Sequence, residues 1–223
     1  MKYKTCISIA ETSPTRLKKT LNSSLKKSEF VEIRFDFLKP EQIPIVLEDI
    51  KKNLKRAVCT LRPKSEGGKF EGNEKERISI LKLIAEYNPR MIDVEFNTIK
   101  QNKSLAKYLK GTKTEILISE HDFKKTPRLS QLQKKLYQMS KFSKNIKIVT
   151  TAKTIEDATT VLELYRKKRN LNLIAFAMGD QGRISRILSL FLGSPYTYVS
   201  LGKPVAPGQF SNDEIKKIIN LKN

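Results

Sequence analysis

The sequence predicts an α/β protein, a (β/α)8 TIM barrel formed as a single domain over residues 1–223. Short runs of apolar and β-branched residues alternate eight times with longer segments of helical periodicity, a pattern that implies a parallel sheet. The length of 223 residues suits a barrel, which needs roughly 200 to 250 residues, and no break in composition marks a linker. An open doubly wound sheet remains the alternative, although no glycine-rich phosphate loop follows the first strand.

The strands are predicted from short runs in which β-branched and apolar residues predominate. The apolar part of the first run, Cys6 to Ala10, is far too short for the core of a signal peptide. In chain order, the expected strands are Thr5–Ala10, Phe30–Phe37, Ala57–Arg62, Met91–Phe96, Glu115–His121, Asn145–Thr151, Leu173–Met178 and Thr197–Leu201.

The helices are predicted from segments whose apolar residues recur with helical spacing between those strands. The last one opens with a capping box, in which Ser211 and Glu214 can satisfy each other's free backbone N–H groups. In chain order, the expected helices are Pro14–Lys27, Pro40–Leu54, Glu74–Tyr87, Thr98–Leu109, Leu129–Phe142, Thr154–Arg169, Gly182–Leu192 and Ser211–Leu221.

Charged residues alternate with apolar ones along two expected strands. Glu32, Arg34 and Asp36 share one face of the second strand, and Asp93 and Glu95 share one face of the fourth. A half-solvated antiparallel sheet would explain the same alternation. In a barrel covered by helices, however, the charged face points inward, where charges are unfavourable unless they are paired or used. We therefore expect a functional site inside the barrel.

Three further polar residues extend this set toward the ends of strands. His121, the only histidine, lies at the end of the fifth strand, Arg62 ends the third, and Lys147 interrupts the apolar sixth strand. Active sites of such barrels lie at the C-terminal ends of the strands. A lysine exposed on an edge strand is the alternative for Lys147.

These residue types together favour chemistry at a carbonyl group. A lysine amine that is desolvated or held near other cations can attack a carbonyl and form a Schiff base, and Lys147 is the best candidate. His121 would supply general acid/base catalysis, and Glu66 would orient its imidazole. Three arginines are candidates for binding an anionic substrate, namely Arg34, Arg62 and Arg186.

Metal and cofactor chemistry have little support in the sequence. With one histidine and two isolated cysteines, Cys6 and Cys59, the chain has no zinc pattern and no disulfide framework. We therefore expect no cofactor and no metal.

The strongly basic composition is compatible with an anionic partner. The formal net charge is +21, from 44 basic and 23 acidic residues. Nucleic-acid binding is therefore an alternative function. The lysines are spread along the whole chain with no basic tail, so we expect a solvated surface and no nucleic-acid partner.

No stretch is long enough to span a membrane, and we expect a cytoplasmic protein without a membrane partner.

Two loops supply further candidate residues. The segment 61–68 follows the third strand and contains Glu66, while the segment 204–209 follows the eighth and ends at Gln209. Prolines and a glycine shape the second loop, which is expected to be a lid or substrate loop. An ordinary turn is the alternative.

Short motifs in order from the first strand to the last loop resemble those of the type I 3-dehydroquinate dehydratase family. Each motif alone is weak, but the ordered set is highly specific and covers nearly the whole chain. The matching pieces are Glu32-Ile33-Arg34-Phe35-Asp36, Leu61-Arg62, Glu66-Gly67-Gly68, Asp93-Val94-Glu95, Ser119-Glu120-His121-Asp122-Phe123, Thr126-Pro127, Lys147, Met178-Gly179, Gly182, Ser185-Arg186, Gly193-Ser194 and Ala206-Pro207-Gly208-Gln209.

The resemblance implies a (β/α)8 barrel of the shikimate pathway that converts 3-dehydroquinate to 3-dehydroshikimate and water. It implies that Lys147 forms the imine, that His121 removes a proton and later protonates the departing hydroxyl, and that Glu66 is the partner of His121. A class I aldolase, which also uses a lysine on the sixth strand, is the alternative among Schiff-base enzymes.

The resemblance also implies a set of substrate-binding positions. Arg186 would bind the substrate carboxylate, and Val205 replaces a hydroxyl residue that many members of the family carry. The short N-terminus resembles compact, archaeal-style members, and a homodimer is expected because family members are often dimers. The implied positions are Ser8, Glu32, Arg34, Arg62, Met178, Arg186, Val205, Ala206 and Gln209.

Overall fold

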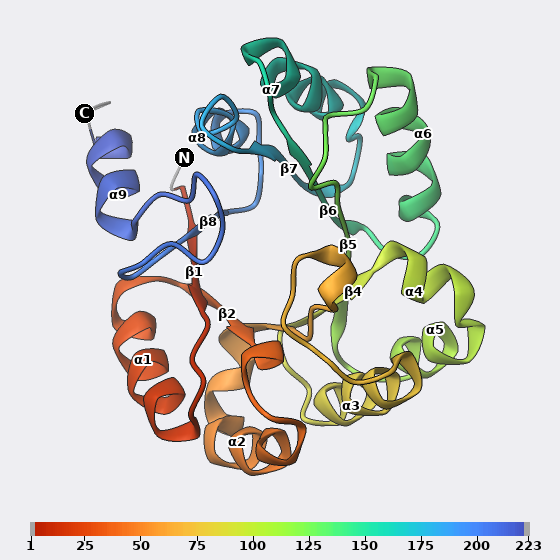
Figure 1. Ribbon diagram of the computed structural model, residues 1–223, viewed down its shortest axis with the longest axis vertical. Helices are drawn as coiled ribbons and strands as arrows, with labels where there is room; N and C mark the ends of the chain where they lie inside the picture. The colour runs from red at the N-terminus through yellow and green to blue at the C-terminus, as the bar shows by residue number, and fades with distance from the viewer. Residues whose placement is uncertain (1–2, 221–223) are drawn as a thin grey trace. The chain divides into compact units, whose positions relative to one another are not determined.

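Two compact units make up the chain in the computed structural model, which describes residues 3–220 (Figure 1). One unit runs from Ile9 to Ile118, and the other comprises Ser119 onward together with the N-terminal residues up to Ser8. The described strands belong to one eight-stranded sheet in the order β7-β6-β5-β4-β3-β2-β1-β8. Strands that follow one another in the sequence are therefore neighbours in the sheet, as the alternation of strands and helices predicts.

The unit Ile9–Ile118 is a layer of parallel strands covered by helices. Strand β2 (Phe30–Arg34) pairs in parallel with β3 (Ala57–Thr60), which in turn pairs with β4 (Met91–Glu95). Helices α1 and α3 pack against β2 and β4 (Figure 1). The helices of this unit are α1 (Pro14–Lys27), α2 (Ile43–Ile50), α3 (Glu74–Glu86), α4 (Phe96–Gln101) and α5 (Lys103–Lys110).

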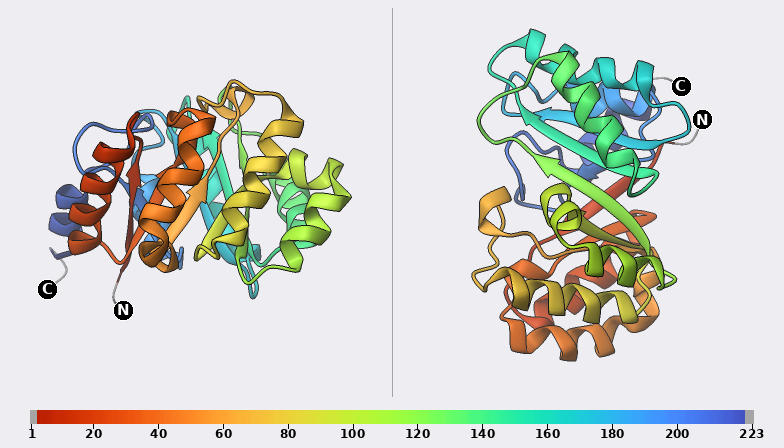
Figure 2. Two further views of the ribbon diagram at one scale, coloured as in Figure 1. Left: turned by 90° about the horizontal axis from the view of Figure 1, so that it is seen from below. Right: turned by 90° about the vertical axis from the view of Figure 1, so that its right-hand side faces the viewer.

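The second unit repeats this arrangement. Strand β6 (Asn145–Thr151) pairs in parallel with β7 (Asn172–Met178) along its whole length, and helices α6 and α7 flank the two strands (Figure 2). Strand β1 (Thr5–Ile9) pairs in parallel with β8 (Thr197–Val199). Strand β5 (Glu115–His121) ends in this unit. Its helices are α6 (Leu129–Ser140), α7 (Ile155–Leu162), α8 (Ser185–Phe191) and α9 (Asn212–Asn220).

Three predicted elements have the observed bounds: the helix Pro14–Lys27 and the strands Glu115–His121 and Asn145–Thr151. Helix α1 begins where the Ser13 side chain accepts a hydrogen bond from the backbone of Arg16. The predicted capping box at α9 is confirmed, because the Ser211 N–H donates to Glu214 and the Glu214 N–H donates to the Ser211 hydroxyl. Leu221, the predicted end of α9, lies outside the described residues.

Other predicted helices are divided in the structure. The expected helix Thr98–Leu109 is two helices, α4 and α5, because Asn102 between them leaves the helical conformation. The expected helix Pro40–Leu54 begins and ends with 3-10 turns around α2, and the expected helix Thr154–Arg169 continues after α7 as the 3-10 turn Glu163–Lys167. The expected helix Gly182–Leu192 is shorter, since α8 begins at Ser185.

Five predicted strands end early: β1 and β4 by one residue, β3 and β8 by two, and β2 by three. Strand β2 ends at Arg34, and Phe35–Phe37 form a 3-10 turn, so the expectation of a strand reaching Phe37 is wrong. The turn brings Asp36 back onto Arg34, and both carboxylate oxygens accept hydrogen bonds from that guanidinium, at 2.8 and 2.7 Å. Strand β3 ends at Thr60, so Arg62 lies in the loop beyond it.

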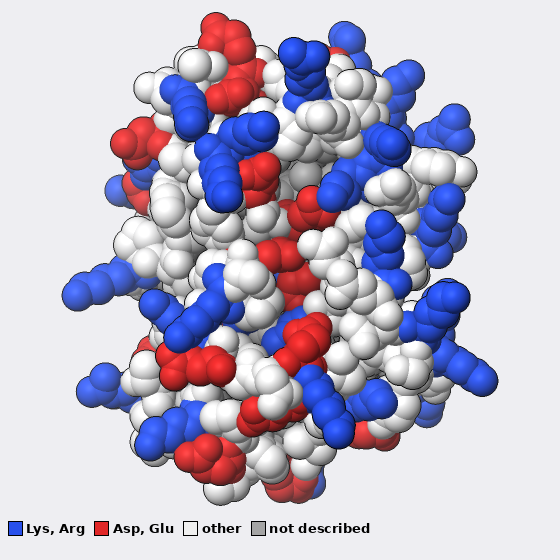
Figure 3. All heavy atoms as spheres, turned by 45° about the vertical axis from the view of Figure 1, so that its right-hand side comes forward, with Lys and Arg blue, Asp and Glu red and all other residues white. Residues whose placement is uncertain are grey.

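The basic side chains do not form a single patch on the face drawn in Figure 3, where acidic side chains lie among them. Within residues 3–220, no helix is long and apolar enough to cross a membrane.

Candidate active site

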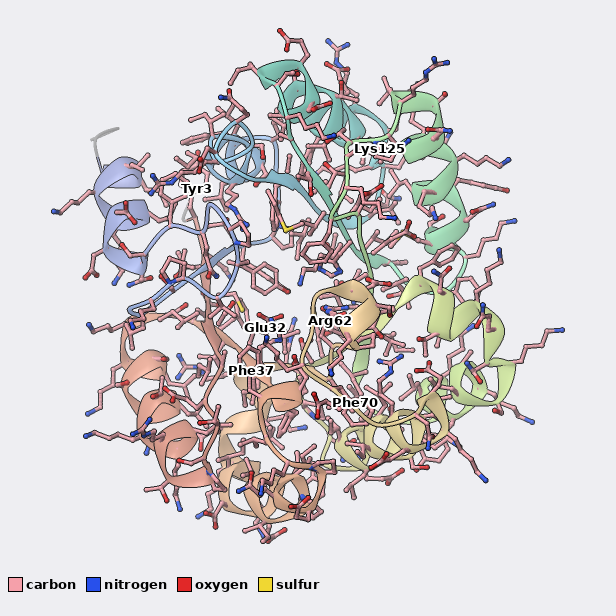
Figure 4. The ribbon with its side chains drawn as sticks, in the orientation of Figure 1. Tyr3, Glu32, Phe37, Arg62, Phe70 and Lys125 are labelled. Carbon is pink, nitrogen blue, oxygen red and sulfur yellow. The ribbon has the colours of Figure 1, made fainter. Side chains whose placement is uncertain are left out.

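Arg62 is the centre of a buried charge cluster in the unit Ile9–Ile118. It lies just after β3, is 3% exposed, and is labelled in Figure 4 together with Glu32 of β2. Its guanidinium donates to Asp93 Oδ2 and to Glu95 Oε1 of β4, both at 2.6 Å. Burial alone would lower the pKa of Arg62, but the charges of Asp93, Glu95 and Glu66 raise it well above its ordinary range. Arg62 is therefore a fixed cation.

Glu95 is shared between two arginines. Its second oxygen, Oε2, accepts a hydrogen bond of 2.6 Å from Arg77 of α3. Burial raises the pKa of Glu95 even though Arg62 and Arg77 both favour its charged form. Sequence reasoning missed Arg77, although one signal was present: it shares the buried face of α3 with Leu81 and Ile84.

Arg34 and Glu32 lie on β2 in the same unit. Arg34 is held by Asp36, whose Oδ2 also accepts a hydrogen bond of 3.0 Å from the backbone of Lys69. Burial lowers the pKa of Arg34, but the hydrogen bonds and the charge of Asp36 more than offset this and raise it. Glu32 is buried and accepts a hydrogen bond of 3.1 Å from Thr60. Glu32 is therefore held by the neighbouring strand β3, and Arg34 by the turn that follows its own strand.

The loop that carries Glu66 is folded tightly against Arg62. Glu66 is half-buried in the 3-10 turn Lys64–Glu66. The Phe70 N–H donates to the Arg62 carbonyl, and a Cβ atom at Gly68 would lie 1.9 Å from that carbonyl oxygen. Only glycine fits at position 68 without moving the loop.

Lys147 lies in the second unit, on the strand where it was predicted. It is 6% exposed, so the alternative of an exposed edge-strand lysine is wrong. Its Nζ atom lies 4.3 Å from the ring centroid of Tyr198 on β8, a cation–π contact. Sequence reasoning missed Tyr198, because a tyrosine within an apolar strand gives no signal of its own.

Arg186 is a buried cation of the same unit. It is 2% exposed, its guanidinium lies 4.2 Å from the Phe176 ring centroid, and it donates a 3.0 Å hydrogen bond to the Pro207 carbonyl. Within residues 3–220, Arg186 makes no ion pair and its Nε has no hydrogen-bond partner. Burial lowers the pKa of Arg186 to about 9, so it remains charged at neutral pH. An unpaired buried guanidinium is suited to an anionic ligand.

The segment after β8 brings three predicted residues, Val205, Ala206 and Gln209, together with Ser8 of β1. Gln209 is buried, donates to the Ser8 hydroxyl at 3.3 Å, and accepts a 2.8 Å hydrogen bond from the backbone of Val205. The Gln209 N–H also donates to the Ala206 carbonyl. This segment folds back on itself, in a turn held by the Gln209 side chain.

Two predicted residues lie at strand ends of the second unit. His121 ends β5, is half-buried, and stacks on Phe123 with 6.3 Å between the ring centroids. Met178 ends β7 and is buried. The pairing of His121 with Glu66 stays a prediction. Among residues 3–220, no group of three His, Cys, Asp or Glu side chains is placed to hold a metal ion.

Comparisons with known proteins show to which family the chain belongs. The family model described as type I 3-dehydroquinase matches residues 5–223. The chain belongs to this family of enzymes. A 3-dehydroquinate dehydratase of Methanocaldococcus jannaschii is 36% identical over 220 residues, which cover 97% of each chain.

Solved structures show the fold. The 3-dehydroquinate dehydratase of Geobacillus kaustophilus is 20% identical with a TM-score of 0.90, covering 99% of this chain and 91% of that one. The type I enzyme of Clostridium difficile, solved with covalently modified comenic acid, is 23% identical with a TM-score of 0.89, covering 99% and 92%. The predicted (β/α)8 barrel is thereby confirmed, while the extent of the domain as residues 1–223 stays a prediction.

Proposed function

We propose that this type I 3-dehydroquinase converts 3-dehydroquinate to 3-dehydroshikimate and water through an imine on Lys147. The observation that carries the proposal is a buried lysine amine on a barrel strand, in a chain of this family. The amine attacks the substrate ketone and water leaves, which gives a protonated imine. This iminium withdraws electrons and so makes the adjacent C–H bond acidic.

His121 is the proposed general acid and base. It takes the proton from the carbon next to the iminium, which leaves an enamine, and then protonates the hydroxyl that departs as water. Hydrolysis of the remaining imine releases the product and restores the lysine. Glu66 is proposed to orient the imidazole and to stabilise its protonated form.

The remaining predicted residues are proposed to bind the substrate. Arg186 binds the carboxylate, because it is a buried cation without an ion-pair partner among residues 3–220. Arg34 and Arg62, which are fixed by carboxylates, position the ring hydroxyls together with Glu32. The second unit supplies the remaining proposed contacts, which come from Ser8, Met178, Val205, Ala206 and Gln209.

The decisive experiment reduces the enzyme with borohydride in the presence of 3-dehydroquinate. We expect hydride to convert the imine into a stable secondary amine on the peptide that contains Lys147, detected by mass spectrometry. Lys144→Ala, which removes an exposed lysine just before β6, is the matched control and should keep the adduct. Absence of the adduct, or its persistence in Lys147→Ala, would show that the proposed nucleophile is wrong.

A second measurement tests His121. The variant His121→Ala should still form the imine but should lose turnover by roughly 10²- to 10⁴-fold, the usual contribution of a general acid/base. Turnover is followed by the absorbance of the conjugated enone product. A cleaved carbon–carbon bond in place of an enone would favour the aldolase alternative.

A cytoplasmic location and a homodimer are part of the proposal, and light scattering in solution tests the dimer.

A further inference from the structure

We infer that Arg77 is a positioning residue for the reaction, acting on Arg62 through Glu95 and through the peptide that precedes Arg62. The inference rests on the proposed function, in which Arg62 positions the substrate. Arg77 lies on α3, outside the set of residues proposed to touch the substrate.

The first step of the argument is the number of groups that Arg77 holds at once. It is 1% exposed, and its Nη1 atom donates to Glu95 Oε2 at 2.6 Å and to the Leu61 carbonyl at 3.0 Å. Its Nε and Nη2 atoms donate to the two carboxylate oxygens of Glu74, at 2.8 and 2.9 Å, and Nη2 also donates to the Thr98 hydroxyl. Only the planar fork of a guanidinium matches this set of acceptors.

The second step is the place of those acceptors around Arg62. Glu95 contacts Arg62 with one oxygen and Arg77 with the other, so the position of the carboxylate depends on both arginines. The Leu61 carbonyl belongs to the peptide bond that leads into Arg62. Arg77 therefore constrains both the backbone and the side-chain partner of Arg62.

The third step is charge balance. Arg62 alone would face two buried carboxylates, Asp93 and Glu95, and Arg77 supplies the second positive charge. Burial already raises the pKa of Glu95, so removal of Arg77 favours its protonated form. A protonated Glu95 is a weaker partner for Arg62, which then loses its fixed position.

The experiment is a double-mutant cycle on kcat/KM for 3-dehydroquinate with Arg77→Met, Arg62→Met and the double variant. Misplacement of a group by about 1 Å can lower a rate about 10²-fold, so we expect Arg77→Met to lower kcat/KM about 10- to 100-fold. If Arg77 acts through Arg62, the same change in the Arg62→Met background should lower kcat/KM less than about twofold.

Arg77→Lys keeps the cycle informative if the methionine variant does not fold. Lysine retains the positive charge beside Glu95 but cannot reach all of the acceptors, so we expect a smaller loss that again disappears in the Arg62→Met background. Arg56→Met is the matched control, because Arg56 donates only to the carbonyls of Leu25, Ser28 and Glu29 among the described residues. It should lower the free energy of unfolding while kcat/KM stays within twofold of wild type.

Two results would overturn the role of Arg77 while leaving the proposed function intact. One is that Arg77→Met lowers kcat/KM by the same factor in the wild-type and the Arg62→Met backgrounds. The other is that the kcat/KM of Arg77→Met stays within twofold of wild type. A wild-type chain that makes no enone would overturn both.

Discussion

Replacement of Arg186 by methionine should stabilise the ligand-free protein while it abolishes substrate binding. Methionine fills a similar volume without charge, and the wild-type guanidinium is buried with no ion pair among residues 3–220. Buried charges are often less favourable than apolar residues of similar size. The folded protein therefore carries an energetic penalty that an anionic ligand relieves.

The magnitude follows from the pKa of Arg186. The pKa of about 9 lies well below that of an exposed arginine, and the difference corresponds to about 5 kcal/mol at about 1.36 kcal/mol per pH unit. The variant loses the hydrogen bond to the Pro207 carbonyl, worth about 2 kcal/mol, and the contact with Phe176, worth about 1 kcal/mol. After these losses are subtracted, the free energy of unfolding of Arg186→Met should exceed that of wild type by about 2 kcal/mol.

Urea unfolding followed by circular dichroism at pH 7, without ligand, measures this difference. In a thermal unfolding experiment, the same gain of about 2 kcal/mol in the free energy of unfolding should raise Tm by roughly 4 to 8 °C for a chain of this size. Arg183→Met is the matched control, since Arg183 is partly exposed and paired with Glu214, and it should bring no gain. Quinate, a carboxylate without the ketone, should raise Tm for wild type and leave that of Arg186→Met unchanged.

The sign of the pH dependence gives an independent check. Below about pH 9 the guanidinium is protonated in both the folded and the unfolded chain, so the difference in stability between Arg186→Met and wild type does not change with pH. Above about pH 9 the folded wild type releases the proton before the unfolded chain does, so wild-type stability rises relative to the variant. An Arg186→Met protein that is less stable than wild type by more than about 1 kcal/mol would refute the reasoning.

Three further predictions concern single side chains. Gly68→Ala should lower kcat/KM about 10²-fold, because the new Cβ would meet the Arg62 carbonyl at 1.9 Å, and steady-state kinetics would show it. Val205→Ser should lower KM for 3-dehydroquinate about two- to tenfold by supplying one hydrogen bond, and an unchanged KM would contradict this. Tyr165→Phe should lower the free energy of unfolding by about 1 to 3 kcal/mol, measured in urea, because the buried backbone N–H of Ala175 donates to the Tyr165 hydroxyl.

The fold could be predicted where local chemistry and tertiary packing agree. Helix α1 has a serine cap and a proline in its first turn, and five of the seven residues of β6 are β-branched, so both have the predicted bounds. The alternation of charged and apolar residues along β2 predicts a strand as far as Phe37, and this is wrong at Phe35–Phe37, because the alternation continues in the sequence after the backbone has turned. The ion pair between Arg34 and Asp36 stabilises the turn, but the period of two places these residues on one face in a strand as well, so it does not distinguish the turn from a continued strand.

The candidate site could be predicted where a polar residue interrupts an apolar strand, as Lys147 does. Arg77 could not be assigned, because its partners Leu61 and Glu95 come from other segments and only the folded chain brings them together. Tyr198 could not be assigned either, since its role depends on the distance from Lys147 rather than on its neighbours in the sequence.

The contact between Lys147 and Tyr198 has a practical consequence for spectroscopy. The chain contains no tryptophan, so its near-ultraviolet absorbance comes mainly from seven tyrosines. One of these rings lies 4.3 Å from the amine proposed to become an iminium. A change in the charge of the reacting nitrogen should therefore change the absorbance of Tyr198, which a difference spectrum recorded during turnover can detect without any added label.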